Sequence, residues 1–199
     1  MAKGDSFERL VPRQLSLWFT HGKRDDLYWR KKNRNRRDGN KYQLGDIICE
    51  TSEGRELTQL FNIELKTGYS KSRSGTTKVK NVPWDLLDLI DYTIRKNQKV
   101  KNFVILDFWE QTTRDAKLTS RIPLLIFKRD YHVPVVVISK EHKSLLSEYL
   151  GDIDVESFLS LNYKDDVLLF YRRDEFFEWL TPEIVCVLAN KLRNGEITI

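Results

Sequence analysis

Two acidic residues and one lysine stand at the ends of two short apolar runs. Asp46 comes directly before the run 47–49, and Glu64 and Lys66 follow the run 60–63. Two carboxylates are typical ligands of a hard cation such as Mg²⁺, which can hold a phosphate oxygen. A lysine beside them can orient an attacking water and stabilise negative charge in the transition state. These residue types favour metal-dependent cleavage of a phosphodiester.

The two apolar runs predict neighbouring strands. Segments 46–51 and 60–66 have the composition of short strands, and the charged connection between them contains a glycine, which favours a hairpin. Side chains two residues apart in a strand share a face, so Glu64 and Lys66 are expected to point the same way. Leu65 would then face the core, while its carbonyl oxygen remains available to a metal.

A simpler interpretation of Glu64 and Lys66 is a surface ion pair on an edge strand, which contributes little to stability. The Glu-x-Lys pattern alone occurs by chance in many chains of this size. Two further features favour a site. Each charged group stands at the end of an apolar run, and the flanking segments are basic.

The composition predicts one globular domain. The chain has 199 residues, of which 40% are hydrophobic and 32% charged, and its formal net charge is +5. Cys49 and Cys186 lie far apart in apolar segments and are interpreted as small hydrophobic residues in a reducing compartment. The first residues lack an apolar signal core, and no apolar stretch reaches membrane-spanning length. These features predict a cytoplasmic protein without a membrane partner.

The positive charge is concentrated in two segments. Residues 23–41 carry nine Lys or Arg residues against three acids, and a second basic stretch covers 67–83. The first segment is predicted to be a loop outside the core that contacts phosphates, with Tyr28 or Trp29 stacking on bases or sugars. The alternative is a solvated arm. The residues predicted to bind nucleic acid are Arg30, Lys31, Lys32, Arg34, Arg36, Arg37, Lys71 and Arg73.

The remaining pattern alternates helices and strands. Helices are predicted over 5–20, 84–95 and 108–118, and a brief buried segment over 104–106. Near-continuous apolar runs at 124–127 and 135–138 are typical of strands buried on both faces, and 167–171 is a further short strand. The predicted buried face of the first helix consists of Phe7, Leu10, Val11, Leu15 and Trp18. The fold class is therefore α/β, with a mixed central sheet flanked by helices.

These segments resemble a known family. The sequences at 45–48 (Gly-Asp-Ile-Ile) and 63–66 (Ile-Glu-Leu-Lys) look like the motifs of the PD-(D/E)xK nuclease superfamily. The order over 4–138 is similar to phage-encoded and archaeal-type Holliday-junction resolvases. In those, a first helix carries an early glutamate, and a basic loop, the two acidic strands and a helix-then-strand unit follow. Here Glu8 stands in the place of the glutamate, and 108–128 resembles the later unit.

The resemblance implies roles for individual residues. Asp46, Glu64 and the Leu65 carbonyl would hold Mg²⁺, with Mn²⁺ as an alternative, and Lys66 would be the catalytic lysine. Glu8 would assist the metal, although a first-turn acid interacting with the helix dipole is an equal alternative. Gln111 would close the site, whereas its simpler interpretation is a solvated helix residue. The family often has Pro-Asp at the first acid, and this chain has Gly-Asp.

The resemblance also implies an activity and an assembly. It predicts a restriction-endonuclease-like core in a single nuclease domain over 1–199, with 139–199 as an extension or subdomain of unknown role. It predicts a magnesium-dependent endonuclease that cleaves branched DNA, specifically a four-way junction, and that acts as a homodimer. The alternatives are a related restriction-type or recombination-type nuclease without junction preference, a non-catalytic DNA-binding module, and a small-molecule enzyme with a metal site.

Overall fold

The computed structural model describes residues 3–31, 44–67, 104–128, 132–150 and 154–199. Its helices are α1 (Lys3–Phe19), α2 (Arg55–Leu60), α4 (Val104–Lys117), α5 (Lys140–Leu150), α6 (Arg173–Trp179) and α7 (Pro182–Arg193). Its strands are β1 (Tyr28–Arg30), β2 (Ile47–Cys49), β3 (Phe61–Thr67), β4 (Ile122–Lys128), β5 (Val135–Ser139), β6 (Leu159–Tyr163) and β7 (Asp166–Arg172). None of the helices in this part of the chain has the length and apolar character needed to cross a membrane.

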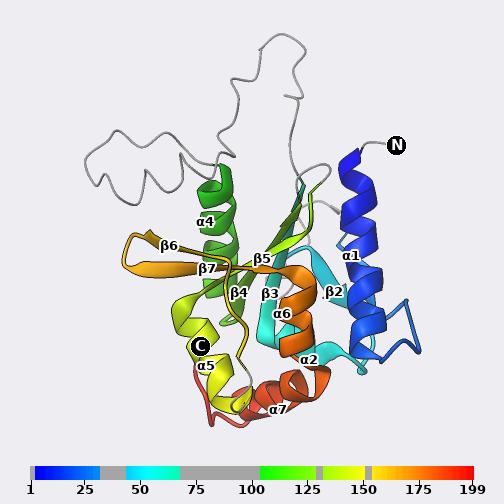
Figure 1. The fold of residues 1–199 in the computed structure, drawn as a ribbon. Helices are drawn as coiled ribbons and strands as arrows, with labels where there is room; N and C mark the ends of the chain where they lie inside the picture. The colour runs from blue at the N-terminus through cyan, green and yellow to red at the C-terminus, as the bar shows by residue number, and fades with distance from the viewer. Residues whose placement is uncertain (1–2, 32–43, 68–103, 129–131, 151–153) are drawn as a thin grey trace.

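A five-stranded mixed sheet is the centre of the fold. Its strand order is β3-β4-β5-β7-β6; β3 pairs with β4 in parallel, and the other neighbours are antiparallel. Figure 1 shows β3, β4 and β5 between α4 and α1, and the β6–β7 hairpin extends past α4. The predicted class, a mixed sheet flanked by helices, is confirmed. β3 lies at one edge of this sheet, and this position matters for the site.

The sheet is buried on both faces. Leu124 and Ile126 of β4 belong to a large apolar cluster with α1, α2, α6 and α7, whereas Leu125 between them belongs to a second cluster under α4. In β5, Val137 likewise belongs to the cluster under α4, and its neighbours belong to the larger cluster. This alternation follows the two-residue period of a strand. It confirms the prediction that the apolar runs at 124–127 and 135–138 are central strands.

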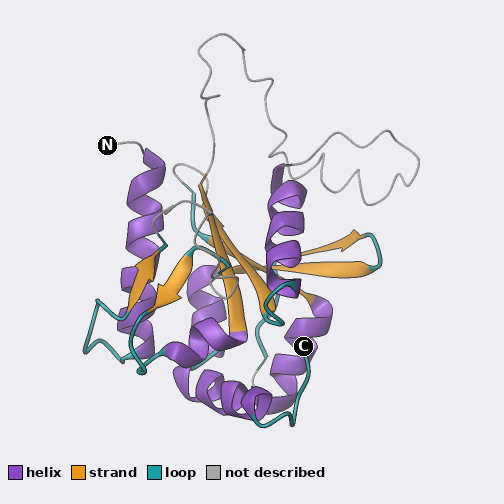
Figure 2. Ribbon diagram, turned by 180° about the vertical axis from the view of Figure 1, so that it is seen from behind, coloured by secondary structure: helices purple, strands orange, loops and turns teal. Residues whose placement is uncertain are grey.

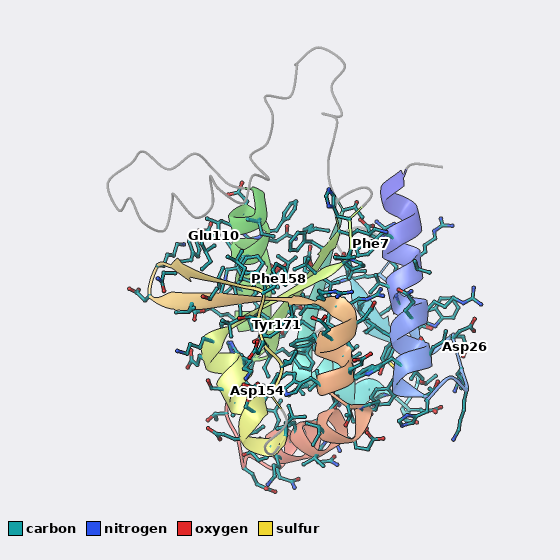
Figure 3. The ribbon with its side chains drawn as sticks, viewed as in Figure 1. Phe7, Asp26, Glu110, Asp154, Phe158 and Tyr171 are labelled. Carbon is teal, nitrogen blue, oxygen red and sulfur yellow. The ribbon has the colours of Figure 1, made fainter. Side chains whose placement is uncertain are left out.

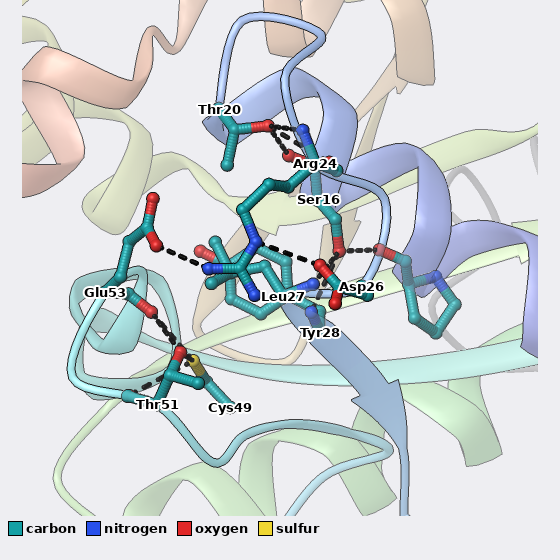
Figure 4. Close-up of polar contacts among 10 residues, drawn as sticks. Ser16, Thr20, Arg24, Asp26, Leu27, Tyr28, Cys49, Thr51 and Glu53 are labelled. Carbon is teal, nitrogen blue, oxygen red and sulfur yellow. Dashed lines mark hydrogen bonds and ion pairs between the residues drawn. The ribbon is translucent and has the colours of Figure 1, made fainter.

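A separate two-stranded ribbon, β1 with β2, lies beside α1 (Figure 2). Hydrogen bonds of Ser16 connect the ribbon to this helix. The Ser16 hydroxyl donates to the Pro12 carbonyl at 2.9 Å and accepts the backbone N–H groups of Leu27 at 3.1 Å and Tyr28 at 2.8 Å (Figure 4). The prediction that 23–41 lies outside the core is therefore wrong for these two residues. Leu27 is fully buried, and Tyr28 is buried with its hydroxyl donating to the Gly54 carbonyl.

The predicted hairpin between 46–51 and 60–66 is also wrong. β2 pairs with β1, and β3 pairs with β4. The connection between β2 and β3 contains the short helix α2, whose Leu57 and Leu60 are fully buried. These two residues are three apart, which is helical spacing, so Leu60 ends the helix and does not begin the strand.

Other boundaries differ from the predictions for local reasons. The segment 104–106 is the first turn of α4 and not a separate buried piece. Leu10 is 47% exposed, although its helical neighbours Phe7 and Val11 are buried. The edge strand β6 is not among the predicted strands, although its sequence Leu-Ser-Leu-Asn-Tyr has the alternation typical of a half-buried strand. The predicted helix at 84–95 lies outside the described residues.

Candidate active site

Asp46 lies against the open edge of β3. Its backbone N–H donates to the Ile63 carbonyl at 2.8 Å, and its carboxylate oxygen Oδ2 accepts the Leu65 N–H at 2.8 Å. These two contacts place the first acid beside the strand that carries the second. The sequence predicts that Asp46 and Glu64 meet. Asp46 contacts Ile63 and Leu65, on either side of Glu64, and its charge acts on the Glu64 carboxyl group, although β2 and β3 form no hairpin.

Leu65 presents its side chain and its backbone in different directions. The side chain is 1% exposed and belongs to the large apolar cluster. In a strand, the N–H and C=O of one residue point to the same edge. Since the Leu65 N–H reaches Asp46, its carbonyl oxygen faces the same edge. Strand geometry therefore directs a backbone oxygen toward the Asp46 carboxylate.

The opposite face of β3 is polar. Asn62, Glu64 and Lys66 alternate with apolar residues of the large cluster, so all three face α4. The Lys66 ammonium forms an ion pair with the Glu64 oxygen Oε1 and lies 5.5 Å from the centre of the Phe108 ring. Gln111 donates from Nε2 to the same Glu64 oxygen at 2.6 Å. The structure therefore brings Gln111 into the site, and the simpler interpretation of this residue, a solvated helix position, is wrong.

Burial dominates the electrostatics of Glu64. Its side chain is 5% exposed, and its pKa is raised to about 7, chiefly because burial removes the carboxyl group from water. The negative charge of Asp46 contributes to this rise, whereas the Lys66 ammonium opposes it. A carboxyl group of this kind gains from a divalent cation, because the cation supplies the positive charge that the buried site lacks.

Gly45 explains the departure from Pro-Asp. Its φ is +93°, and a Cβ at this position would lie 2.9 Å from Asn62 Oδ1 and 3.0 Å from the Ile63 carbonyl oxygen. Proline fixes φ near −65°. The backbone turn that delivers Asp46 to the edge of β3 therefore excludes proline, and the crowding around Cα disfavours any side chain.

Glu8 takes part in an ion pair with Arg30 of β1. The Glu8 carboxylate is 13% exposed and the Arg30 guanidinium 35% exposed. Arg30 stands opposite Ile47 in the ribbon, and Ile47 directly follows Asp46 in the chain. The Glu8–Arg30 ion pair is therefore next to Asp46. This contact joins one predicted metal-assisting residue to one predicted nucleic-acid-binding residue.

Of the other predicted nucleic-acid-binding residues, the structure describes Lys31. Its backbone N–H donates to the Asp46 carbonyl at 2.8 Å, which places β1 beside the site. The other predicted residues, Lys32, Arg34, Arg36, Arg37, Lys71 and Arg73, lie outside the described residues.

Sequence reasoning does not select the polar residues that support the site. Asn62 is fully buried and donates to the Thr112 carbonyl at 3.4 Å, while its Oδ1 is the one buried side-chain oxygen or nitrogen in the described residues that lacks a partner. A signal is available in the alternation Asn62-x-Glu64-x-Lys66. On α4, the spacing of Phe108, Gln111 and Thr112 places them on one helical face.

A comparison with protein families identifies the relationship. A model described as "Phage putative PDDEXK endonuclease" matches residues 91–178. This match, which covers less than half of the chain, supports the resemblance to the PD-(D/E)xK superfamily. No curated protein and no solved structure matches it. The matched residues include Gln111 and extend past 138, so the family relationship reaches into the segment 139–199, as far as residue 178.

PD-(D/E)xK nucleases generally use divalent metals, and the donor set here suits one. Within the described residues, no group of three His, Cys, Asp or Glu side chains forms a metal site. Two carboxylates and a backbone carbonyl around β3 are the kinds of ligand that usually hold Mg²⁺, with water and substrate phosphate completing the coordination. Asp46, Glu64 and Lys66 precede the matched residues, so their roles in cleavage are proposals.

We predict that Gly45→Ala impairs both folding stability and cleavage by this nuclease. The substitution places a Cβ against Asn62 and Ile63 at a positive φ, so it should cost about 1–3 kcal/mol of unfolding free energy and displace Asp46. The measurements are urea unfolding and single-turnover cleavage at saturating metal.

Gly22→Ala is the matched control for this prediction. Gly22 has a φ of +82°, but nothing lies within 4 Å of a Cβ there. This variant should show the backbone strain alone and retain full cleavage. Equal losses in the two variants would show that contact with Asn62 and Ile63 is irrelevant to the site.

Proposed function

We propose that Asp46, Glu64, Lys66 and Gln111 form the active site of a magnesium-dependent DNA endonuclease whose preferred substrate is a four-way junction. The observation that carries the proposal is the grouping of these residues around β3: Asp46 accepts the Leu65 N–H at the open edge, and Lys66 and Gln111 contact one oxygen of Glu64 on the face toward α4. A family of phage endonucleases matches the adjoining part of the chain.

The chain's own residues have distinct tasks in this proposal. Asp46, Glu64 and the Leu65 carbonyl would hold the metal, whose charge would polarise the scissile phosphate and stabilise the leaving oxygen. Gln111 fixes the orientation of the Glu64 carboxylate through its 2.6 Å hydrogen bond. Lys66 would hold a water in line with the phosphorus and offset negative charge as it develops.

Lys66 is suited to this task by its surroundings. Its side chain is 13% exposed, and its ammonium is held by Glu64 on one side and by the ring of Phe108 on another. A lysine restrained in this way loses little further side-chain entropy when it orients a water. Its position two residues after Glu64 on the same face keeps it within reach of a metal-bound phosphate.

The preference for a junction and the homodimer rest on the resemblance to resolvases. Resolvases make paired incisions in two strands, which a two-fold dimer places symmetrically. A second candidate is a related nuclease that cuts linear duplex equally well. The two differ in substrate preference and share the same metal site.

The deciding experiment compares a labelled four-way junction with a linear duplex of matched sequence, in Mg²⁺ and in EDTA. We expect paired, metal-dependent incisions in the junction and little cutting of the duplex. Equal cutting of both substrates would contradict junction preference and leave the nuclease. No cutting of either in Mg²⁺ or Mn²⁺ would contradict the proposed activity.

We also predict that metal binding depends on pH through Glu64. Because the pKa of this carboxyl group is raised to about 7, the metal-free protein carries a proton there at pH 6 and loses it by pH 8. A metal must displace that proton, so affinity should be roughly tenfold weaker at pH 6 than at pH 8. Calorimetric titration with Mn²⁺ should show proton release near pH 6, and Glu64→Gln should abolish that release.

A further inference from the structure

We propose that Trp29 is a stacking platform for an unpaired nucleobase next to the candidate active site. This deepens the proposed function, on which it rests, by adding a requirement for unpaired or flared bases near the scissile phosphate. Trp29 is 53% exposed although it lies in the middle of β1, between two residues that face the protein.

The register of the ribbon places Trp29 on the face that carries Asp46. Trp29 stands opposite Ile48, and the Lys31 N–H donates to the carbonyl of Asp46. Since side chains alternate along each strand and directly opposed residues share a face, Trp29 and Lys31 lie on one face with Ile48 and Asp46.

The opposite face of the ribbon is directed to the protein. Tyr28 and Ile47 are buried in the large apolar cluster, and Arg30 pairs with Glu8 of α1. The sequence allows either Tyr28 or Trp29 to stack on nucleic acid. The structure excludes Tyr28, which is 2% exposed and whose hydroxyl is bonded to Gly54. The exposed ring on β1 is that of Trp29.

Spacing and charge identify the occupant as a nucleic acid base. Trp29 is two residues from Lys31, or about 7 Å along the strand, and Lys31 is bonded to Asp46. An indole at this distance reaches the base of a nucleotide whose phosphate lies at the acidic site. Lys31 adds a positive charge to the same face, which suits a polyanion and not a basic or neutral surface.

The ligand must offer an exposed ring face. Every base has a π-face, so stacking on an indole tolerates any sequence and contributes about 1–3 kcal/mol per base. In a continuous duplex these faces are covered by neighbouring base pairs. The platform therefore favours single strands, flaps and the opened centre of a branched molecule over linear duplex.

The test is binding in EDTA, where cleavage plays no part. The probes are a single-stranded 12-mer with a central 2-aminopurine and a fully paired duplex of the same length. Wild type should quench the 2-aminopurine fluorescence and bind the single strand. Trp29→Ala and Trp29→Leu should lose the quenching and weaken single-strand binding about 5- to 100-fold, with duplex binding nearly unchanged. Trp29→Phe should retain part of both signals.

Phe158→Ala is the matched control, because Phe158 is an aromatic residue of similar exposure (57%) just before β6 (Figure 3). This variant should behave as wild type. Two results would overturn the proposal. One is unchanged single-strand affinity and quenching in Trp29→Leu; the other is an equal loss for duplex and single strand. A change in sedimentation mass with DNA binding unaffected would assign Trp29 to a protein interface and would overturn it as well.

The test is independent of the proposed activity. If neither the junction nor the duplex is cleaved in Mg²⁺ or Mn²⁺ but Trp29 still quenches the probe in EDTA, the nuclease assignment fails and the base-binding site stands. If cleavage occurs and quenching is absent, the base-binding site fails and the nuclease assignment stands.

Discussion

Asp46→Asn should lower single-turnover cleavage about 10³-fold or more and leave DNA binding nearly unchanged. The asparagine keeps an oxygen that can accept the Leu65 N–H, so the edge contact survives while the charge is lost. A metal between Asp46 and Glu64 would lose one of its two carboxylates, and phosphate polarisation would fall with it. The measurement is single-turnover cleavage at several Mg²⁺ concentrations, with affinity measured separately in EDTA.

Two further variants separate charge from position. Asp46→Ala removes both the charge and the acceptor for the Leu65 N–H, so it should add a loss of stability of about 1–3 kcal/mol. Asp165→Asn removes an exposed acid in the turn between β6 and β7 and should have no effect on cleavage. Cleavage by Asp46→Asn at the wild-type rate would exclude Asp46 from the metal site, whatever the substrate.

The sequence predicts the central residues of the candidate site because their signal is local. Asp46, Glu64 and Lys66 each adjoin an apolar run, and alternation along one strand is enough to place Glu64 and Lys66 together. The same local signal predicts the sheet, because β4 and β5 are apolar almost without interruption. The fold class and the three charged residues therefore follow from short-range patterns in the chain.

Strand pairing does not follow from such patterns, because it depends on contacts between distant segments. The sequence between β2 and β3 is short and charged, which is compatible with a hairpin. The burial of Leu57 and Leu60 against the core makes it a helix, and β2 pairs with β1 instead. The prediction for Tyr28 fails for a similar reason. The neighbouring basic residues suggest a position exposed to solvent. In the structure Tyr28 is buried, and its backbone N–H donates to the Ser16 hydroxyl of α1.

The residues that support the site are equally hidden in the sequence. Gly45 departs from the family pattern, but its positive φ and its lack of a Cβ, which would collide with Asn62, allow Asp46 to reach β3. Gln111 is named only by the resemblance, and its contact with Glu64, 47 residues away, depends on the packing of α4 on β3. Distances of this kind are set by tertiary packing and leave no pattern within a single element.

Lys66→Met gives the second large effect and tests what the lysine does. Methionine keeps an unbranched side chain of similar length next to Phe108 and removes the ammonium group. If Lys66 orients the attacking water, turnover should fall about 10²- to 10⁴-fold. Lys143→Met is the matched control. Lys143 is also 13% exposed, is paired with an acid and lies 5.5 Å from an aromatic ring centre, that of Trp179. It should retain full cleavage.

The pKa of Glu64 provides a test that separates a role of Lys66 in the hydrolytic step from its electrostatic effect on Glu64. The Lys66 ammonium lowers the pKa of Glu64, so its removal should raise that pKa above about 7 and weaken metal binding at neutral pH. At pH 9 and saturating Mn²⁺, Glu64 is ionised and the metal is bound even without the lysine. A loss of turnover that persists under these conditions assigns Lys66 to the hydrolytic step. Recovery to the wild-type rate would show that the lysine acts only by lowering the pKa of Glu64, so that the carboxylate is ionised when the metal binds.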